Sequence, residues 1–191
     1  MADTKMVKSV GEHWVCATLA RHGWAPALTR DGIERTDILA VATTLQDRPM
    51  VEIQVKTASK MSNTTSWPLG YKAQLFSRSP HEWFVFVLLP QVPQPPKAFV
   101  VPRDHVSAAT WIAHQDWLTD PGVPSGKRSA GLDQARVREA VWAGYEDRWD
   151  LLAMPTTEVP VLLPGWMRTR ALEERVGLPS GHPWATTLPG W

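Results

Sequence analysis

The order of hydrophobic and polar residues predicts a helix at the start of the chain, followed by strands. Hydrophobic residues recur at intervals of three and four between Lys5 and His22, and Gly23 follows where a helix would end. Residues 24–29 and 38–42 then follow as strand segments. Between residues 50 and 57, valine and isoleucine alternate with polar residues, which predicts a strand with one buried and one polar face.

The middle of the chain continues the series of strands. Residues 58–79 are polar and rich in serine and threonine, so we interpret them as a long surface loop with a short helical piece around residues 73–76. Residues 83–89 lack polar alternation, which is typical of an interior strand covered on both faces. A proline-rich connection leads to residues 98–101, which would form a hairpin with that strand. This order predicts an α/β fold with a mixed sheet flanked by helices.

Helices are expected to close the domain. Asp104 is placed to cap a helix that ends at about Leu118. Another helix is predicted from four hydrophobic or aromatic residues at every fourth position: Val137, Val141, Tyr145 and Trp149.

Many of the prolines concentrate after Met154, and this change in composition suggests a boundary. We therefore expect a domain of residues 1–154 and a Pro/Trp-rich C-terminal extension, residues 155–191, that packs on the domain or on a partner. Its apolar residues distinguish it from a free disordered tail, and a short helix is expected near residues 171–176.

Composition excludes several classes of protein. A chain of 191 residues with 43% hydrophobic residues suits one domain with a buried core. No apolar run approaches the roughly 18 residues of a membrane span, and the N-terminus lacks a secretory signal, so we expect a cytoplasmic protein without membrane contact. The single cysteine, Cys16, excludes an internal disulfide and a cysteine-based metal site. A net charge of +1 means that any DNA-binding face must come from local clustering of basic residues.

The polar face of the strand predicted at residues 50–57 carries the candidate chemistry. Side chains two residues apart share a face of a strand, so Glu52, Gln54 and Lys56 form a row. Asp37 comes just before another strand, from where its carboxylate can reach a neighbour. The Asp37 carboxylate, the Gln54 amide oxygen and the Val55 main-chain carbonyl are hard oxygen ligands of the kind that Mg²⁺ or Mn²⁺ prefers. Lys56 supplies a cation that can orient or activate water.

A fourth residue, Glu12, would complete this cluster if the first helix packs beside the strands. Glu12 on an opening helix, Asp37 before a strand and Gln54-Val55-Lys56 on the next strand together resemble the PD-(D/E)XK nuclease superfamily. Within this superfamily, the motif is most similar to those of archaeal Holliday-junction resolvases and Mrr-type restriction endonucleases. The Mrr-type enzymes include a variant with Gln-x-Lys at this position. The resemblance covers about residues 5–101. Two positions depart from the usual motif: Gln54 replaces an acid, and Thr36 stands where glycine or proline is common.

This resemblance implies a restriction-endonuclease-like core with a mixed sheet of about four to five strands flanked by helices. It also implies a Mg²⁺- or Mn²⁺-dependent endonuclease that hydrolyses DNA phosphodiester bonds. Asp37, Gln54, Val55 and Glu12 would then hold the metal, with Lys56 as a further catalytic residue and Glu52 as a secondary candidate. The alternative is a catalytically weakened nucleic-acid-binding or accessory module with the same fold.

Other interpretations of the same residues stay open at this point. A row of Glu, Gln and Lys is also common on the exposed face of an edge strand, and Asp37 could be a turn residue. Three basic residues of the long loop, Lys60, Lys72 and Arg78, are candidates to grip DNA phosphates or to form a solvated surface. Trp67 in that loop is a candidate for base stacking. We expect DNA as the partner, and a homodimer is left open.

Overall fold

The computed structural model describes residues 3–30, 34–59 and 65–191. Their main element is a five-stranded sheet in the order β1-β2-β3-β5-β6. These strands are β1 (Trp24–Leu28), β2 (Ile38–Ala42), β3 (Met50–Ser59), β5 (Glu82–Leu89) and β6 (Lys97–Pro102). Only β3 and β5 pair in parallel, and the other neighbours are antiparallel. The mixed sheet expected from the sequence is therefore confirmed, with five strands.

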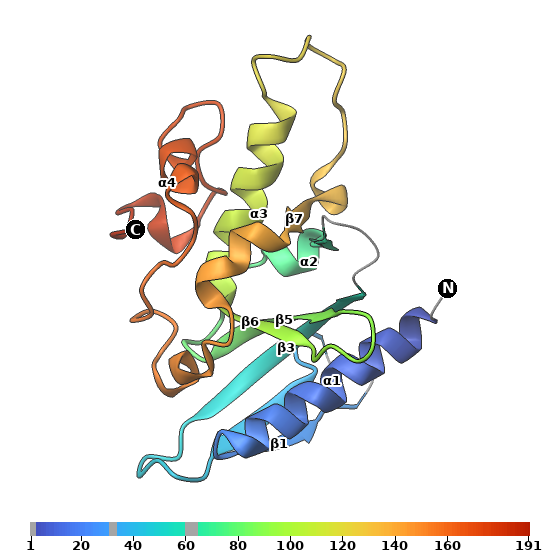
Figure 1. Cartoon of the computed structure of the whole chain (residues 1–191). Coiled ribbons are helices and arrows are strands. Elements are labelled where there is room, and N and C mark those ends of the chain that lie inside the picture. The colour runs from blue at the N-terminus through green and yellow to red at the C-terminus, as the bar shows by residue number, and fades with distance from the viewer. Residues whose placement is uncertain (1–2, 31–33, 60–64) are drawn as a thin grey trace.

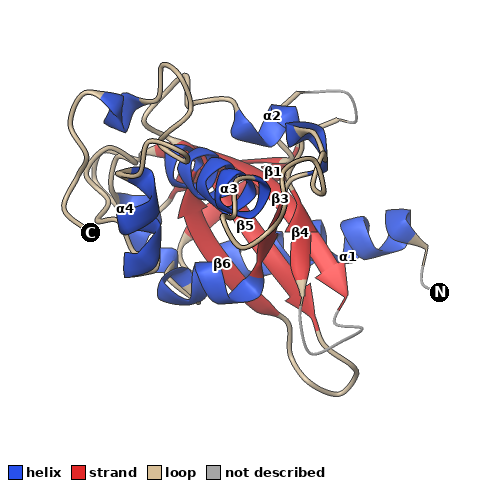
Figure 2. Ribbon diagram, turned by 90° about the horizontal axis from the view of Figure 1, so that it is seen from above, coloured by secondary structure: helices blue, strands red, loops and turns tan. Residues whose placement is uncertain are grey.

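Helices cover both faces of this sheet. Helix α1 (Thr4–Arg21) lies on one face, and α3 (Arg103–Leu118) lies on the other (Figure 1). Viewed from above, α3 runs over the sheet on the side opposite α1 (Figure 2). The strand and helix predictions for residues 5–22, 38–42, 50–57 and 83–89 are confirmed.

The side chains of the central strand, β3, point alternately to the α1 side and to the α3 side of the sheet. Val51, Ile53 and Val55 are buried, and Thr57 on the same face lies against α1. A Cβ atom at Gly11 of α1 would lie 1.9 Å from the Thr57 Oγ1 atom, so only glycine permits this approach of helix and strand. β3 has neighbours on both sides, and its polar residues are half-buried. The interpretation as an exposed edge strand is therefore wrong.

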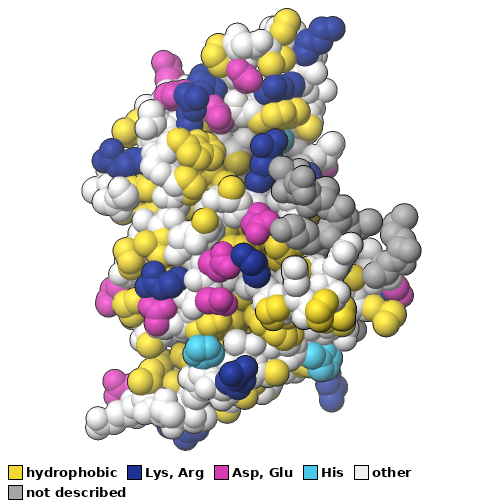
Figure 3. All heavy atoms as spheres, viewed as in Figure 1, with side chains coloured by type: hydrophobic (Ala, Val, Ile, Leu, Met, Phe, Trp, Pro, Cys, Tyr) yellow, Lys and Arg dark blue, Asp and Glu magenta, His cyan; other side chains and the backbone are white. Residues whose placement is uncertain are grey.

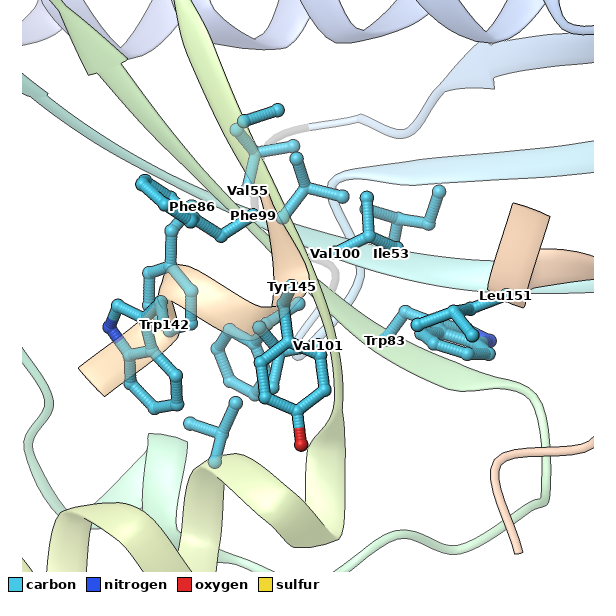
Figure 4. Packing of buried hydrophobic residues seen from close by; sticks show 14 of the residues in the cluster. Ile53, Val55, Trp83, Phe86, Phe99, Val100, Val101, Trp142, Tyr145 and Leu151 are labelled. Carbon is cyan, nitrogen blue, oxygen red and sulfur yellow. The ribbon is translucent and has the colours of Figure 1, made fainter. Parts of the chain in front are cut away.

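Aromatic residues fill the space between the sheet and the α3 layer. The Phe86 and Trp142 rings stack with centroids 4.8 Å apart. Figure 4 shows both residues within the buried cluster. Trp67, on the short strand β4 (Ser66–Pro68), packs against Phe86 and Phe99 and is buried. The prediction that Trp67 is available for base stacking is wrong, because the loop folds back as a strand that turns this side chain into the core.

Three local predictions need correction. Asp104 does not cap α3, because Pro102 holds the N-cap position and Asp104 accepts hydrogen bonds from the Ser77 amide and hydroxyl instead. The helix predicted through residues 137–149 is replaced by β7 (Arg136–Arg138) and the 3-10 helices η2 (Glu139–Tyr145) and η3 (Trp149–Ala153). Its four apolar positions are buried as expected, but β7 pairs with β4 and so has to be extended.

The remaining short helices complete the α3 side. Helix α2 (Tyr71–Gln74) lies near the short helix expected in the long loop, and η1 (Leu132–Gln134) precedes β7. The C-terminal segment contains α4 (Gly165–Ala171), earlier than the helix predicted near residues 171–176, and η4 (Pro183–Ala185).

Residues 155–191 contact the rest of the chain at several points. The Trp111 indole nitrogen donates to the Val176 carbonyl over 2.9 Å, and the Leu162 amide donates to the Tyr145 hydroxyl over 2.9 Å. The division at residue 154 remains a proposal about domain organisation. Within the described ranges, no helix is long and apolar enough to cross a membrane.

Candidate active site

The first part of the candidate site lies where the chain enters β2. The Asp37 amide donates to the Ile53 carbonyl over 2.9 Å, which extends the pairing of β2 with β3 by one residue. The Asp37 Oδ2 atom accepts a hydrogen bond of 2.8 Å from the Val55 amide. Since the amide and carbonyl of one residue in a strand point to the same side, the Val55 carbonyl also points toward Asp37. The carboxylate is thereby fixed against β3 while 20% of the side chain stays exposed.

Helix α1 brings a second carboxylate to the same place. The Lys8 Nζ atom lies 3.2 Å from Glu12 Oε1 and 3.6 Å from Asp37 Oδ1. Glu12 is 15% exposed, and the close contact of Gly11 with Thr57 sets its distance from β3. The two carboxylates therefore approach the same ammonium group, and helix α1 places Glu12 beside Asp37. Lys8 was not singled out from the sequence, although its spacing of four residues from Glu12 on a helix is the signal for such a pair.

The electrostatics of this cluster shift two ionisation equilibria. Burial raises the pKa of the Glu12 carboxyl, the charge of Asp37 and a hydrogen bond with it raise the pKa further, and Lys8 opposes this shift. Burial lowers the pKa of the Lys56 ammonium, and the charges of Lys8 and Arg103 lower it further, while Asp37 acts in the opposite direction. The pKa of Lys56 thus depends on the charges of the carboxylate cluster and on the charge of Arg103 at the start of α3.

Gln54 is placed differently from the sequence-based hypothesis. Its Oε1 atom accepts a hydrogen bond of 2.9 Å from Arg103 Nη2, at the start of α3. A guanidinium only donates hydrogen bonds, so the amide oxygen of Gln54 must face Arg103. Within the described parts of the chain, no hydrogen bond joins Gln54 to Asp37 or Glu12. The structure thus brings Asp37, Glu12 and the Val55 main chain together, and it directs the Gln54 oxygen toward α3.

A buried ion network holds this side of β3. The Glu82 carboxylate lies 2.6 Å from Arg35 Nη2 and 2.8 Å from Arg103 Nε, and it accepts a hydrogen bond of 2.5 Å from the Arg78 amide. The Arg103 side chain is 1% exposed, and its Cζ atom lies 4.6 Å from the Phe84 ring centroid. Burial raises the pKa of Glu82, but the two guanidiniums and the Arg78 amide outweigh it and hold the pKa below its usual value. Sequence reasoning missed this network, because its members are far apart in the chain.

The remaining candidates lie around these two groups. Glu52 Oε2 accepts a hydrogen bond of 3.2 Å from the Thr36 hydroxyl, so this secondary candidate is turned toward the loop before β2. Lys72 is exposed, pairs with Glu34 over 3.1 Å, and its carbonyl accepts from Arg103. The Arg78 residue is exposed while its amide binds Glu82. Lys60 lies outside the described residues.

The donor atoms fit a hard divalent cation. The Asp37 and Glu12 carboxylates already hold the positive charge of Lys8, and the Val55 carbonyl points to the same place. In the described ranges, no group of three or more His, Cys, Asp or Glu side chains is arranged to hold a metal. A metal here would therefore rely on two carboxylates, a main-chain carbonyl and oxygens of water or substrate, which is a coordination that suits Mg²⁺.

We compared the sequence and the structure with those of known proteins, and only the structure gave a match. No protein-family model matches the sequence, and no curated protein matches it. The structure is similar to that of a bacterial homing endonuclease, I-Ssp6803I, with a TM-score of 0.51 and 13% identity over 83% of this chain and 97% of that chain. It also matches a Holliday junction resolvase, Hjc from Archaeoglobus fulgidus, with a TM-score of 0.39 and 15% identity over 71% of this chain and 91% of that chain. The likeness to I-Ssp6803I shows that this chain shares the overall fold of that structure.

Proposed function

We propose that the protein is a metal-dependent DNA endonuclease that hydrolyses phosphodiester bonds. The observation that carries this proposal is the meeting of Asp37, Glu12 and the Val55 main chain beside Lys56. Asp37, Glu12 and the Val55 carbonyl would bind Mg²⁺ or Mn²⁺. The Gln54 amide oxygen accepts a hydrogen bond from Arg103 with one lone pair, so it would bind the metal only with its second lone pair. The similarity of the fold to that of a homing endonuclease agrees with this assignment.

Each residue has a distinct role in the proposed reaction. The Val55 amide fixes the Asp37 carboxylate in one orientation, so that it needs no rearrangement when the cation binds. Lys56 is poorly hydrated, and its ammonium can offset the charge that develops on the phosphate. Glu12 shares Lys8 with Asp37, so its carboxylate is placed to complete the metal shell beside Asp37. The bound metal would polarise the phosphate and the attacking water.

The direct test is cleavage of supercoiled plasmid and of branched DNA in Mg²⁺, in Mn²⁺ and in EDTA. We expect cleavage only with a divalent metal, and Lys56→Ala and Asp37→Ala should each reduce the rate by at least about 100-fold. Lys97→Ala is the matched control, because Lys97 is exposed on β6 and pairs only with Glu146 among the described residues. Undiminished cleavage by either site variant would refute the site assignment.

A second candidate is a catalytically weakened nucleic-acid-binding or accessory module with the same fold. It is favoured by the Gln54 amide oxygen, which is neutral and already bonded to Arg103. Gln54→Glu separates the two candidates, since a carboxylate there adds a charged ligand and keeps a partner in Arg103. If weak metal binding limits an active nuclease, this variant should cleave on the order of tenfold faster at low Mg²⁺. DNA binding without cleavage in both proteins would support the module.

A further inference from the structure

A cleft lies apart from the candidate active site, on the α3 side of the molecule. It has a volume of about 640 Å³ and is bounded by α3, α4 and the ribbon of β4 and β7. The residues that give it its character are Trp117, Trp166, Arg136, Arg138, His114 and Ser66. None of the candidate site residues that the structure describes lines it. Its volume falls in the range of about 300–1,000 Å³ that is usual for ligand sites.

The cleft exposes two indole rings. Trp117 is 42% exposed and Trp166 is 45% exposed, whereas the large rings of Trp67, Trp83 and Trp142 are buried in the core. The Arg128 guanidinium, which pairs with Asp120 over 3.2 Å, lies over one face of the Trp117 ring, 5.0 Å from its centroid. Figure 3 shows hydrophobic side chains beside basic ones on the upper part of one face, over α3 and α4. Such exposed indoles suit a ligand with flat rings.

The charge that faces the cleft is positive. Arg136 and Arg138 extend from β7, and no Asp or Glu of the described ranges lines the cleft. Arg136 donates to the Ser66 hydroxyl over 3.1 Å and to the Ser66 carbonyl over 3.3 Å, so neutral groups hold its guanidinium in place. Among the described residues, neither arginine takes part in an ion pair. By contrast, Arg170 and Arg175 on the neighbouring surface both pair with Asp116.

We propose that this cleft binds a short segment of single-stranded DNA. Phosphates would contact Arg136 and Arg138, and unpaired bases would stack on Trp117 and Trp166. Flat rings combined with unpaired basic groups are the features that recognise single strands without dependence on sequence. A peptide made of Asp and Glu would contact the arginines but has no rings to stack on the indoles. The identification of the ligand as DNA rests on the proposed nuclease function, and the substrate would be DNA with an unpaired region near the cut.

The test measures binding of a fluorescently labelled oligothymidine of about ten nucleotides by anisotropy, in EDTA, with the full chain. A strand of abasic sites of the same length is the second probe, and a polyglutamate peptide is the competitor. The variant Arg136→Gln/Arg138→Gln should bind both strands at least about tenfold more weakly, and its salt dependence should fall by about 1.4 in slope. The variant Arg21→Gln/Arg48→Gln is the matched control, because it removes two exposed charges elsewhere.

Trp117→Ala tests the stacking part of the proposal. It should weaken binding of oligothymidine by about 5- to 150-fold and leave the abasic strand nearly unchanged. Trp117→Phe should keep most of the affinity, because it keeps an aromatic face. Circular dichroism melting of every variant identifies any that fail to fold, and Trp166→Ala then serves as the second stacking variant.

Several outcomes would overturn the proposal. Equal binding by the cleft variants and the control variant would show that the cleft is not the binding site. Equal losses of affinity for both strands in Trp117→Ala would show that bases do not stack on Trp117. Full competition by polyglutamate would assign the cleft to an acidic partner.

The nuclease proposal and the cleft proposal can fail independently of each other. If the parent protein binds oligothymidine through the cleft but cleaves no DNA, only the nuclease function is refuted. If it cleaves DNA while the cleft variants bind as the parent does, only the cleft is refuted.

Discussion

The two sides of β3 carry similar ionic groups in very different surroundings. On the α1 side, Asp37 and Glu12 share Lys8 and remain partly exposed. On the α3 side, Glu82 is enclosed by Arg35 and Arg103, with side chains that are almost completely buried. The first group has an excess of negative charge and the second has an excess of positive charge. The two groups therefore have different roles. The buried group of Glu82, Arg35 and Arg103 stabilises the fold, and the partly exposed group of Asp37 and Glu12 stays available for a cation and a substrate.

This difference has an energetic basis. A charge taken out of water is stable only with partners in good geometry, and removing one partner leaves the others buried and unpaired. Exposed ion pairs are weak because water competes for both groups. The buried network is therefore expected to control folding, and the exposed cluster is expected to control activity.

The largest expected effect comes from breaking the buried network. Glu82→Gln removes the carboxylate between Arg35 and Arg103, which leaves two buried guanidiniums without a counter-charge. We expect a loss of about 3–5 kcal/mol in the free energy of unfolding, measured by urea denaturation. Arg103→Met should cost less, because it leaves the balanced pair of Arg35 and Glu82.

The matched control for this prediction is Glu173→Gln. Glu173 pairs with Arg170 and Arg175 on the surface, so its loss should lower the free energy of unfolding far less than the loss of Glu82 does. Similar losses in Glu82→Gln and Glu173→Gln would contradict the distinction between the buried and exposed groups.

A smaller effect is expected at the contact that holds α1 against β3. Gly11→Ala places a methyl group against Thr57, so the helix has to move away from the strand. We expect a loss of about 1–3 kcal/mol in the free energy of unfolding, with weaker cleavage because Glu12 moves with the helix. The double variant Gly11→Ala/Thr57→Ala removes the two shortest contacts and leaves the Cβ of residue 57 at 3.0 Å, so it should recover part of the stability. If it recovers nothing, the steric explanation is wrong.

The smallest expected effect is on the pH dependence of cleavage. The pKa of Glu12 is raised above its ordinary value of 4.5, so its carboxylate is lost as the pH falls through that raised value. Because a carboxylate must be ionised to bind the cation, cleavage at low Mg²⁺ should decline toward acid pH, by at most about tenfold per pH unit, and saturating Mg²⁺ should shift this decline to lower pH. The pH–rate profile of Glu12→Gln should lack this step at a lower overall rate, and an unchanged profile would exclude Glu12 as the titrating group.

Much of the fold and part of the candidate site could be predicted from the sequence. The alternation at Val51, Ile53 and Val55 predicted β3, and the uninterrupted apolar run at residues 83–89 predicted an interior strand. Periodicity failed between residues 137 and 149, since burial at every fourth position does not distinguish a helix from a short strand followed by 3-10 turns. It failed at Trp67 because a polar loop concealed a strand that pairs with residues about 70 positions later in the chain.

The sequence by itself determined the residues that could carry chemistry, namely Asp37, Glu12 and the polar row of β3, because their types and spacing follow local rules. Only the tertiary structure decided their partners. Arg103 turns the Gln54 oxygen toward α3, and Lys8 joins the two carboxylates. The reason is that ion pairs depend on distances of a few ångströms between elements, and these distances are set by packing, such as the contact of Gly11 with Thr57, rather than by position along the chain.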